Sequence, residues 1–170
     1  MAELTPQERL QPSLLDRLTD DEPGARDESR NKRILSIRQL RECVLRDLSW
    51  LLNTTQLEAN EDLDAYPEVR RSTVNYGVPS LAGNTLSGVD IDVLQRRMRA
   101  AILSFEPRLI GNSLRVAVIG AEEQKLNKLS FAIEGELWAQ PVPLRVFLKT
   151  DVDLEIGDVT VADMTSGGAR

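Results

Sequence analysis

The stretch Asp90–Arg108, DIDVLQRRMRAAILSFEPR, decides how the rest of the chain is arranged. Its apolar residues recur at spacings of three and four, which places them on one stripe of an α-helix. The residues of this stripe are Ile91, Leu94, Met98, Ala101, Ile102 and Phe105. We expect the stripe to face the core. Residues after Asn112 have strand character and residues before Asp90 have helix and loop character, so this helix separates two halves.

Both ends of this helix carry local signals. Ser87 or Asp90 can cap the first turn. Pro107 disfavours helical geometry in the residue before it, so we expect Glu106 to leave the helix in an extended conformation. Two opposite charges, Glu106 and Arg108, therefore flank a rigid proline beside the core.

Composition and charge narrow the class of protein. The chain has 170 residues, of which 41% are hydrophobic and 28% charged, as is typical of a globular protein. The net charge of −6 disfavours a general nucleic-acid binder and favours protein partners. Cys43 has no second cysteine to pair with. Because a signal peptide and a long apolar run are also absent from the sequence, we expect a cytoplasmic protein without direct membrane insertion.

The sequence divides into three parts. Residues 1–32 are expected to form an N-terminal arm, with a short docking helix that begins at Pro12-Ser13 and a polar linker after it. Residues 33–163 are expected to form a single α+β domain, and residues 164–170 a flexible tail. The apolar residues of the arm are Leu10, Leu14, Leu15 and Leu18.

The domain begins with a long helix that starts at Ser29 or Ile34 and ends at Leu52. The residues predicted for its core stripe are Ile37, Leu40, Val44, Leu48 and Leu51. Arginines crowd the rest of its surface, which is either an ordinary solvated face or a contact for an acidic partner. A polar loop over 53–64 and a helical turn that starts at Tyr66 and ends near Thr73 are expected to follow.

Alternating residues predict an antiparallel meander of three strands over 114–119, 129–137 and 144–149. We expect a turn over 120–127 and, over 152–161, a last short strand in an acidic stretch. The two long helices would cover the apolar face of the sheet, giving an α+β fold with three to four strands. The strands at 144–149 and 152–161 offer either an edge for a partner strand or an ordinary charge-protected edge.

Tyr76 lies in a compact turn over 72–81. Gly77 can adopt a positive φ there, and Pro79 fixes the exit of the chain. The turn either presents Tyr76 to a partner or uses its ring to fill the space between the two helices.

The residue inventory excludes much catalytic chemistry. Without histidine, the chain lacks the means for a Ser-His-Asp site, and one cysteine is too few for a thiolate zinc cage. No phosphate-binding glycine loop is present, so we expect no cofactor and no metal. Carboxylate chemistry remains, with Glu106 as general acid and Asp90 or Asp92 as the second carboxylate of a glycosidase. Arg108 argues against it, because a nearby cation lowers a carboxyl pKa that a general acid needs raised.

Three motifs in order carry a family resemblance: the segments 14–18 (LLDRL), 72–81 (STVNYGVPSL) and 102–109 (ILSFEPRL). Over residues 10–160 the chain resembles the baseplate wedge proteins of contractile phage tails, the GPW family that has been labelled lysozyme-like. Within that family it is most similar to the baseplate subunits of type VI secretion systems.

The resemblance implies a structural protein without enzymatic activity, present in multiple copies in a cytoplasmic baseplate that docks on the inner membrane complex. Its expected partners are the wedge proteins TssF, TssG and TssK and the sheath subunits TssB and TssC. The family's sheet resembles the interlocking domain of the sheath subunit, which implies a role in starting sheath polymerisation.

The resemblance also implies partner-binding residues. The docking motif of the family falls here on Glu106, Pro107 and Arg108. The other expected partner-binding residues are Tyr76, Leu14, Leu15 and Leu18. From the residues alone, an alternative is that Glu106 and Arg108 satisfy one another or cap the strand below.

Overall fold

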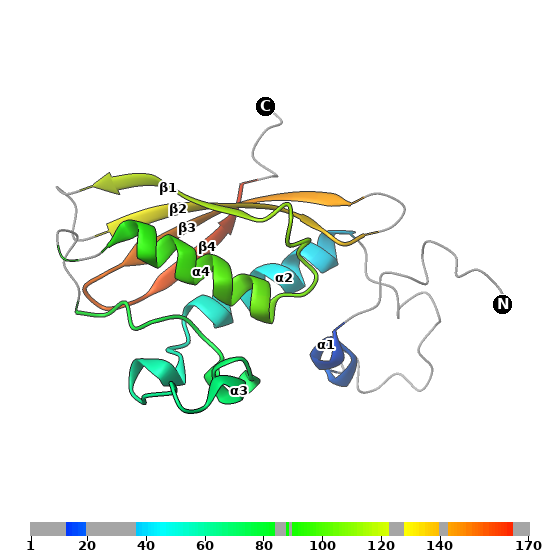
Figure 1. Ribbon diagram of the computed structural model, residues 1–170. Coiled ribbons are helices and arrows are strands. Elements are labelled where there is room, and N and C mark those ends of the chain that lie inside the picture. The colour runs from blue at the N-terminus through cyan, green and yellow to red at the C-terminus, as the bar shows by residue number, and fades with distance from the viewer. Residues whose placement is uncertain are drawn as a thin grey trace.

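The computed structural model describes residues 13–19, 37–83, 88, 90–122, 128–139 and 143–164. In this part of the chain, two helices cover one face of a four-stranded antiparallel sheet (Figure 1). The strand order is β1-β2-β3-β4, so each strand pairs with its neighbours in sequence. The predicted α+β class with an antiparallel sheet is therefore confirmed.

The strands are β1 (Arg115–Glu122), β2 (Lys128–Leu137), β3 (Leu144–Asp153) and β4 (Val159–Asp163). Ile133 of β2 lies opposite Val116 of β1 and Leu148 of β3, so these three residues share the inner face of the sheet. All three are buried. The alternation that predicted a half-buried strand over 129–137 is thus present in β2.

Three of the predicted strands have other bounds in the structure. The last strand, predicted over 152–161, is β4 at Val159–Asp163, because Val152 and Asp153 belong to β3 and a turn separates the two strands. The sequence predicts a turn from residue 120, but β1 continues to Glu122 because an irregularity between Val118 and Gly120 lets the strand resume its pairing with β2. The strand predicted over 144–149 extends to Asp153. The following turn stops it there, since Asp153 Oδ1 accepts hydrogen bonds from the backbone N–H groups of Glu155 and Ile156.

The strand predicted over 144–149 is not an edge strand along its whole length. β3 lies between β2 and β4, so Leu148 and Lys149 are paired on both sides and form no edge. Among the described residues, no strand lies beside Leu144–Val146 on the β4 side, where Arg41 Nη2 donates to the carbonyl oxygen of Arg145 at 3.2 Å. The edge strands of the sheet are β1 and β4.

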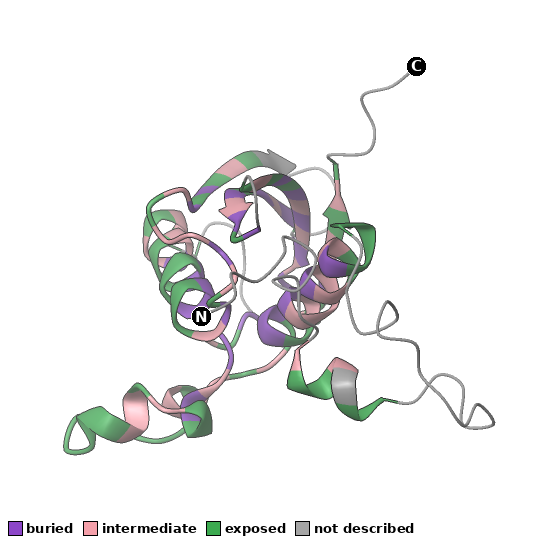
Figure 2. Cartoon of the chain, turned by 90° about the vertical axis from the view of Figure 1, so that its right-hand side faces the viewer, coloured by how far each residue is buried: buried purple, intermediate pink, exposed green. Residues whose placement is uncertain are grey.

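The covering helices are α2 (Ile37–Leu52) and α4 (Ile91–Phe105). Both bury most of the predicted stripe against the sheet, with Ile91 and Phe105 of α4 half-buried, and Figure 2 shows the buried residues gathered between the layers. The buried residues of α2 are Leu40, Val44, Leu48, Leu51 and Leu52, and those of α4 are Leu94, Met98, Ala101 and Ile102. Ile37 is 53% exposed, contrary to its prediction as a core residue, because it lies one turn before the first buried residue. The predicted start of this helix lies outside the described residues.

The predicted docking helix is present as α1 (Leu14–Leu18), capped by Ser13. It lies beside α2 at one end of the molecule (Figure 1). Leu10 and the predicted linker beyond Thr19 lie outside the described residues, as does the tail from residue 165. No described helix has the length and apolar character needed to cross a membrane.

Between α2 and α4 the chain forms a lobe that projects from the two layers (Figure 2). Its short helices are η3 (Leu57–Ala59), α3 (Pro67–Arg70) and η4 (Thr73–Asn75). Sequence analysis predicted α3 but not η3. Buried Asn75 holds the lobe together, since its Oδ1 accepts from Glu58 N at 2.9 Å and its Nδ2 donates to Arg70 O at 3.0 Å.

The neck of the lobe is closed by two backbone hydrogen bonds, from Val78 N to Thr54 O and from Gln56 N to Val78 O, both at 2.9 Å. Gly77 has φ +127°, and a Cβ at this position would lie 2.3 Å from Thr54 O. The neck therefore requires glycine, and it fixes the preceding residue, Tyr76, beside α2 and α4.

Candidate functional site

The end of α4 is fixed from both sides. Asp90 caps its start, accepting from Val93 N at 2.9 Å, and Glu106 N still donates to Ile102 O at 2.8 Å. The backbone of Glu106 then leaves helical geometry, with φ −120° and ψ 76°, as predicted for a residue before proline. Two residues later, Arg108 O accepts from Trp138 N at 2.7 Å. The helix on one side and the end of β2 on the other thus hold Glu106, Pro107 and Arg108.

Glu106 and Arg108 pair with each other. The Glu106 side chain is only 3% exposed; its Oε1 accepts from Arg108 N at 3.1 Å and from Arg108 Nε at 2.7 Å, and its Oε2 accepts from Arg108 Nη2. The alternative that the two charges satisfy one another is therefore what the structure contains. The contact between Arg108 and Trp138 is a backbone hydrogen bond, so it joins this segment to the end of β2 without using either charge.

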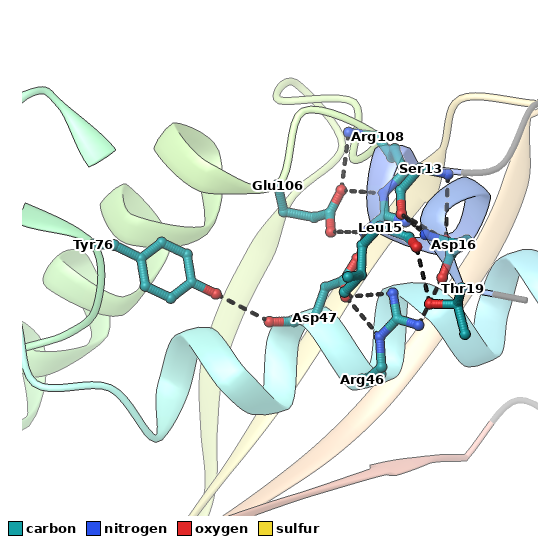
Figure 3. A network of polar contacts seen from close by, with 9 residues as sticks. All are labelled: Ser13, Leu15, Asp16, Thr19, Arg46, Asp47, Tyr76, Glu106 and Arg108. Atoms are coloured by element: carbon teal, nitrogen blue, oxygen red, sulfur yellow. Dashed lines mark hydrogen bonds and ion pairs between the residues drawn. The ribbon is translucent and has the colours of Figure 1, made fainter. Parts of the chain in front are cut away.

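Asp47 of α2 joins this pair to a second arginine. Its Oδ2 accepts from Arg108 Nη2 at 2.5 Å, and its Oδ1 accepts from Arg46 Nε at 2.9 Å and from Arg46 Nη2 at 2.8 Å. Arg46 Nη1 donates to Asp16 Oδ1 of α1 at 2.6 Å. Figure 3 shows the resulting continuous chain of contacts from α4 through α2 to α1. We call these five residues the charge cluster: Asp16, Arg46, Asp47, Glu106 and Arg108.

Hydrogen bonding shifts the pKa values of Arg108 and Asp16 toward their ionised forms. Burial alone would lower the pKa of Arg108, but Glu106 and Asp47 outweigh it and raise that pKa. Burial alone would raise the pKa of Asp16, whereas hydrogen bonds from Arg46, Ser13 and Cys43 lower it to about 2. Both groups are therefore charged at neutral pH. Arg108 Nη1 is buried and has no hydrogen-bond partner among the described residues.

Cys43 lies beneath α1. Burial, together with its hydrogen bond to Asp16, raises the pKa of its thiol to about 11. At neutral pH the thiol is protonated and donates to the Asp16 carboxylate, so it is a poor nucleophile. Cys43 therefore helps to hold α1 on α2.

Tyr76 contributes the aromatic part of the site. Its ring meets Phe105 edge to face, with 5.1 Å between centroids, and its hydroxyl lies 3.5 Å from the carbonyl oxygen of Asp47 (Figure 3). The ring thus fills space between α2 and α4, and it also borders an open pocket of about 390 Å³. The residues that line this pocket are Ser13, Asp47, Leu51, Tyr76, Phe105, Glu106, Pro107 and Arg108. The pocket therefore brings together four of the predicted site residues.

The three predicted leucines of the arm lie beside the pocket but do not line it. Leu14 and Leu18 are 72% and 73% exposed, and Leu15 is 44% exposed. Asp16, rather than the leucines, makes the polar contact that holds α1 on α2. Arg46 also stacks 5.1 Å above the ring of half-exposed Trp50. Exposed apolar side chains thus surround the charge cluster.

The carboxylates proposed for glycoside hydrolysis are not brought together. Asp90 and Asp92 lie at the first turn of α4, and Glu106 follows its last residue. A helix of 15 residues separates them by roughly 20 Å, at about 1.5 Å per residue, whereas glycosidase carboxylates lie about 5–10 Å apart. The geometry does not support that catalytic pair.

Sequence reasoning missed Asp16, Arg46 and Asp47 as members of the site. α2 is rich in arginine, so in the sequence Arg46 and Asp47 look like ordinary residues of a solvent-exposed face. Only the fold shows that they lie beside Arg108. One local signal was available for α1. Ser13 and Asp16 have the spacing of a capping box, and both of its hydrogen bonds are present.

Comparison with known families gives one result. A family model described as baseplate wedge protein gp25 matches residues 38–142, well over half of the chain. The match spans α2, the lobe, α4, β1 and β2, and it includes Tyr76 and Glu106-Pro107-Arg108. No curated protein and no solved structure matches the chain significantly.

Proposed function

The chain belongs to the baseplate wedge protein gp25 family, and on this premise we propose that it is the TssE-type baseplate subunit of a type VI secretion system. The family makes it a structural component of a contractile-tail baseplate wedge. The finer proposal is that several copies connect the wedge proteins TssF, TssG and TssK to the first ring of TssB and TssC sheath subunits. The assembly would sit in the cytoplasm, docked on the inner membrane complex.

The observation that carries this proposal is the pocket at the end of α4. Glu106, Pro107 and Arg108 line an accessible pocket although their charges are already paired, and Arg108 remains 24% exposed. Because α2, α4 and β2 fix these groups before a partner arrives, docking requires little ordering of side chains. Charge-assisted hydrogen bonds of this kind are both strong and directional. We therefore assign wedge binding to this pocket, with Tyr76 as part of its wall.

The arm supplies a second part of the proposed wedge contact. α1 turns Leu14 and Leu18 outward, one helical turn apart, next to the pocket. An exposed apolar pair on a helix held by a polar contact favours binding to another protein. We propose that residues 1–32 act as an arm for the domain 33–163, and that α1 contacts the wedge through Leu14, Leu15 and Leu18.

The sheet supports the proposed contact with the sheath. β4 pairs with β3 only from Leu148 to Val152, which leaves a short step at this side of the sheet among the described residues. A partner strand can extend a sheet at such an edge through backbone hydrogen bonds. We propose that the first sheath ring contacts the sheet at β4.

Enzymatic activity is a weaker hypothesis. A general acid must be protonated so that it can donate a proton to the leaving group. Both carboxylate oxygens of Glu106 instead accept hydrogen bonds from Arg108, as an ionised carboxylate does. Asp90 lies at the far end of α4, and Asp47, which lies near Glu106 through their shared partner Arg108, accepts hydrogen bonds from Arg46 and Arg108 on its two carboxylate oxygens. The family is structural, and the geometry agrees with that role.

Copurification tests the proposal. The full-length chain is mixed with a reconstituted TssF–TssG wedge complex and separated by size-exclusion chromatography. We expect coelution of the wild type and of Glu42→Gln, an exposed change on α2 away from the pocket. Leu14→Ser/Leu18→Ser should elute largely free. Failure of the folded wild type to coelute with the wedge would reject the proposed function.

A further inference from the structure

The charge cluster is not balanced. Three carboxylates, from Asp16, Asp47 and Glu106, share two guanidinium groups, from Arg46 and Arg108. In the described part of the chain no third cation pairs with them. The cluster therefore carries one net negative charge, and Asp47, Glu106 and Arg108 of the cluster line the pocket.

The carboxylates of the cluster are partly to almost fully shielded from water. The side chains of Glu106, Asp16 and Asp47 are 3%, 12% and 24% exposed. Removing a carboxylate from water is unfavourable unless a cation compensates it. Each of the three carboxylates has an arginine partner, but the cluster as a whole keeps one negative charge in excess at a site that remains open to a partner.

The walls of the pocket fit a particular kind of side chain. Leu51, Phe105 and Pro107 are apolar and Tyr76 presents its ring, while the charged lining residues are two carboxylates, of Asp47 and Glu106, and one guanidinium, of Arg108. Lysine and arginine combine a long apolar stem with a cationic head, so they suit a pocket that is largely apolar and carries an excess of negative charge. A cation beside an aromatic ring gains further stabilisation. A volume of about 390 Å³ has room for one such side chain.

We propose that the pocket receives a single lysine or arginine side chain, presented by the wedge protein that binds this face. Its stem would pack between Tyr76, Phe105 and Leu51, and its cationic head would meet Asp47 and Glu106. Leu14 and Leu18 would contact apolar residues that flank this basic residue on the partner. The identity of the carrier rests on the proposed function, whereas affinity of the pocket for a basic side chain does not.

The test is a titration of the ¹⁵N-labelled full-length chain at low salt, followed by NMR. The probes are N-acetyl-lysine-N-methylamide, its neutral counterpart N-acetyl-norleucine-N-methylamide and its anionic counterpart N-acetyl-glutamate-N-methylamide. We expect saturable shifts of the Tyr76, Phe105 and Glu106 amides with the lysine derivative alone. The binding should weaken as salt is added.

A matched pair of variants locates the charge that is responsible. Asp47→Asn keeps the shape of the side chain and removes the excess negative charge, so the lysine derivative should bind about tenfold more weakly. Glu42→Gln removes one negative charge from the exposed side of the same helix and should bind as the wild type does. If Asp47→Asn does not fold, the three probes on the wild type still decide the matter.

Two results would overturn the inference: no saturable shift with the lysine derivative, or equal shifts with the norleucine derivative. This failure is distinguishable from failure of the proposed function. A cation-selective pocket in a protein that does not coelute with the wedge rejects only the baseplate assignment. Coelution without cation binding rejects only the inference about the basic side chain.

Discussion

Replacement of Arg108 by methionine should destabilise the fold more than any change on an exposed face. Arg108→Met keeps an apolar stem but removes the guanidinium that pairs with Glu106 and Asp47. Breaking a buried ion pair by removing one partner lowers the free energy of unfolding by about 3–5 kcal/mol. Because Arg108 is 24% exposed and water can reach Asp47, we expect the lower end, about 3 kcal/mol. For a chain of this size, that corresponds to a decrease in Tm of about 6–12 °C.

Urea denaturation at pH 7, followed by circular dichroism, measures this change. The midpoint should fall while the m-value stays constant, because the surface exposed on unfolding does not change. The double variant Glu106→Gln/Arg108→Met buries no unpaired carboxylate at position 106 and should recover at least about half of the loss. A loss below about 1 kcal/mol for Arg108→Met, or a double variant no more stable than the single one, would refute the reasoning.

Three further predictions concern the arm and the neck of the lobe. The folded-state pKa of Asp16, about 2, lies below its ordinary value, so its contact with Arg46 should persist at pH 4 and be lost as the pH falls through 2. The chemical shifts of the α1 amides report this contact, and its loss already at pH 4 would contradict the prediction. Because the pKa of its thiol is raised to about 11, Cys43 in the folded protein should react with iodoacetamide at pH 8 far more slowly than in the urea-unfolded chain. Asp16→Asn should speed the reaction of the folded protein. Equal rates in wild type and variant would contradict the contact between Cys43 and Asp16. Gly77→Ala should lower the free energy of unfolding, measured in urea, by about 2 kcal/mol or more. Gly83 also has a positive φ but open space around its Cβ position, so Gly83→Ala should lower this free energy by only about 1 kcal/mol. Equal losses would contradict the prediction that Gly77 is needed to close the neck.

Local signals in the sequence predicted the elements that position the site. The periodicity of α4, its cap at Asp90 and its end before Pro107 each depend on residues close in sequence. The alternation in β2 likewise follows from one buried and one wet face. These features were predictable because neighbouring residues determine them.

The charge cluster was not predictable in the same way, because it depends on tertiary structure. Asp16, Asp47 and Arg108 come from three distant segments, and only the packing of α1 and α4 against α2 brings them together. The extent of β3 also escaped prediction, since the acidic residues that begin at Asp151 resemble those of a loop. The turn after Asp153 combines the Asp153 side chain with Gly157, which has φ +79° and donates its N–H to Asp153 O at 2.8 Å.

The central claim is that a wedge protein docks in the pocket formed around Glu106 and Arg108. Isothermal titration of the full-length chain with the TssF–TssG complex tests it most directly, with the double variant Glu106→Gln/Arg108→Met, checked for folding, beside wild type and Glu42→Gln. The account predicts that the double variant has a Kd about 100-fold higher, since it loses two charge-assisted contacts, and that Glu42→Gln binds as wild type does. A folded double variant that binds the wedge within about twofold of wild type would contradict the claim.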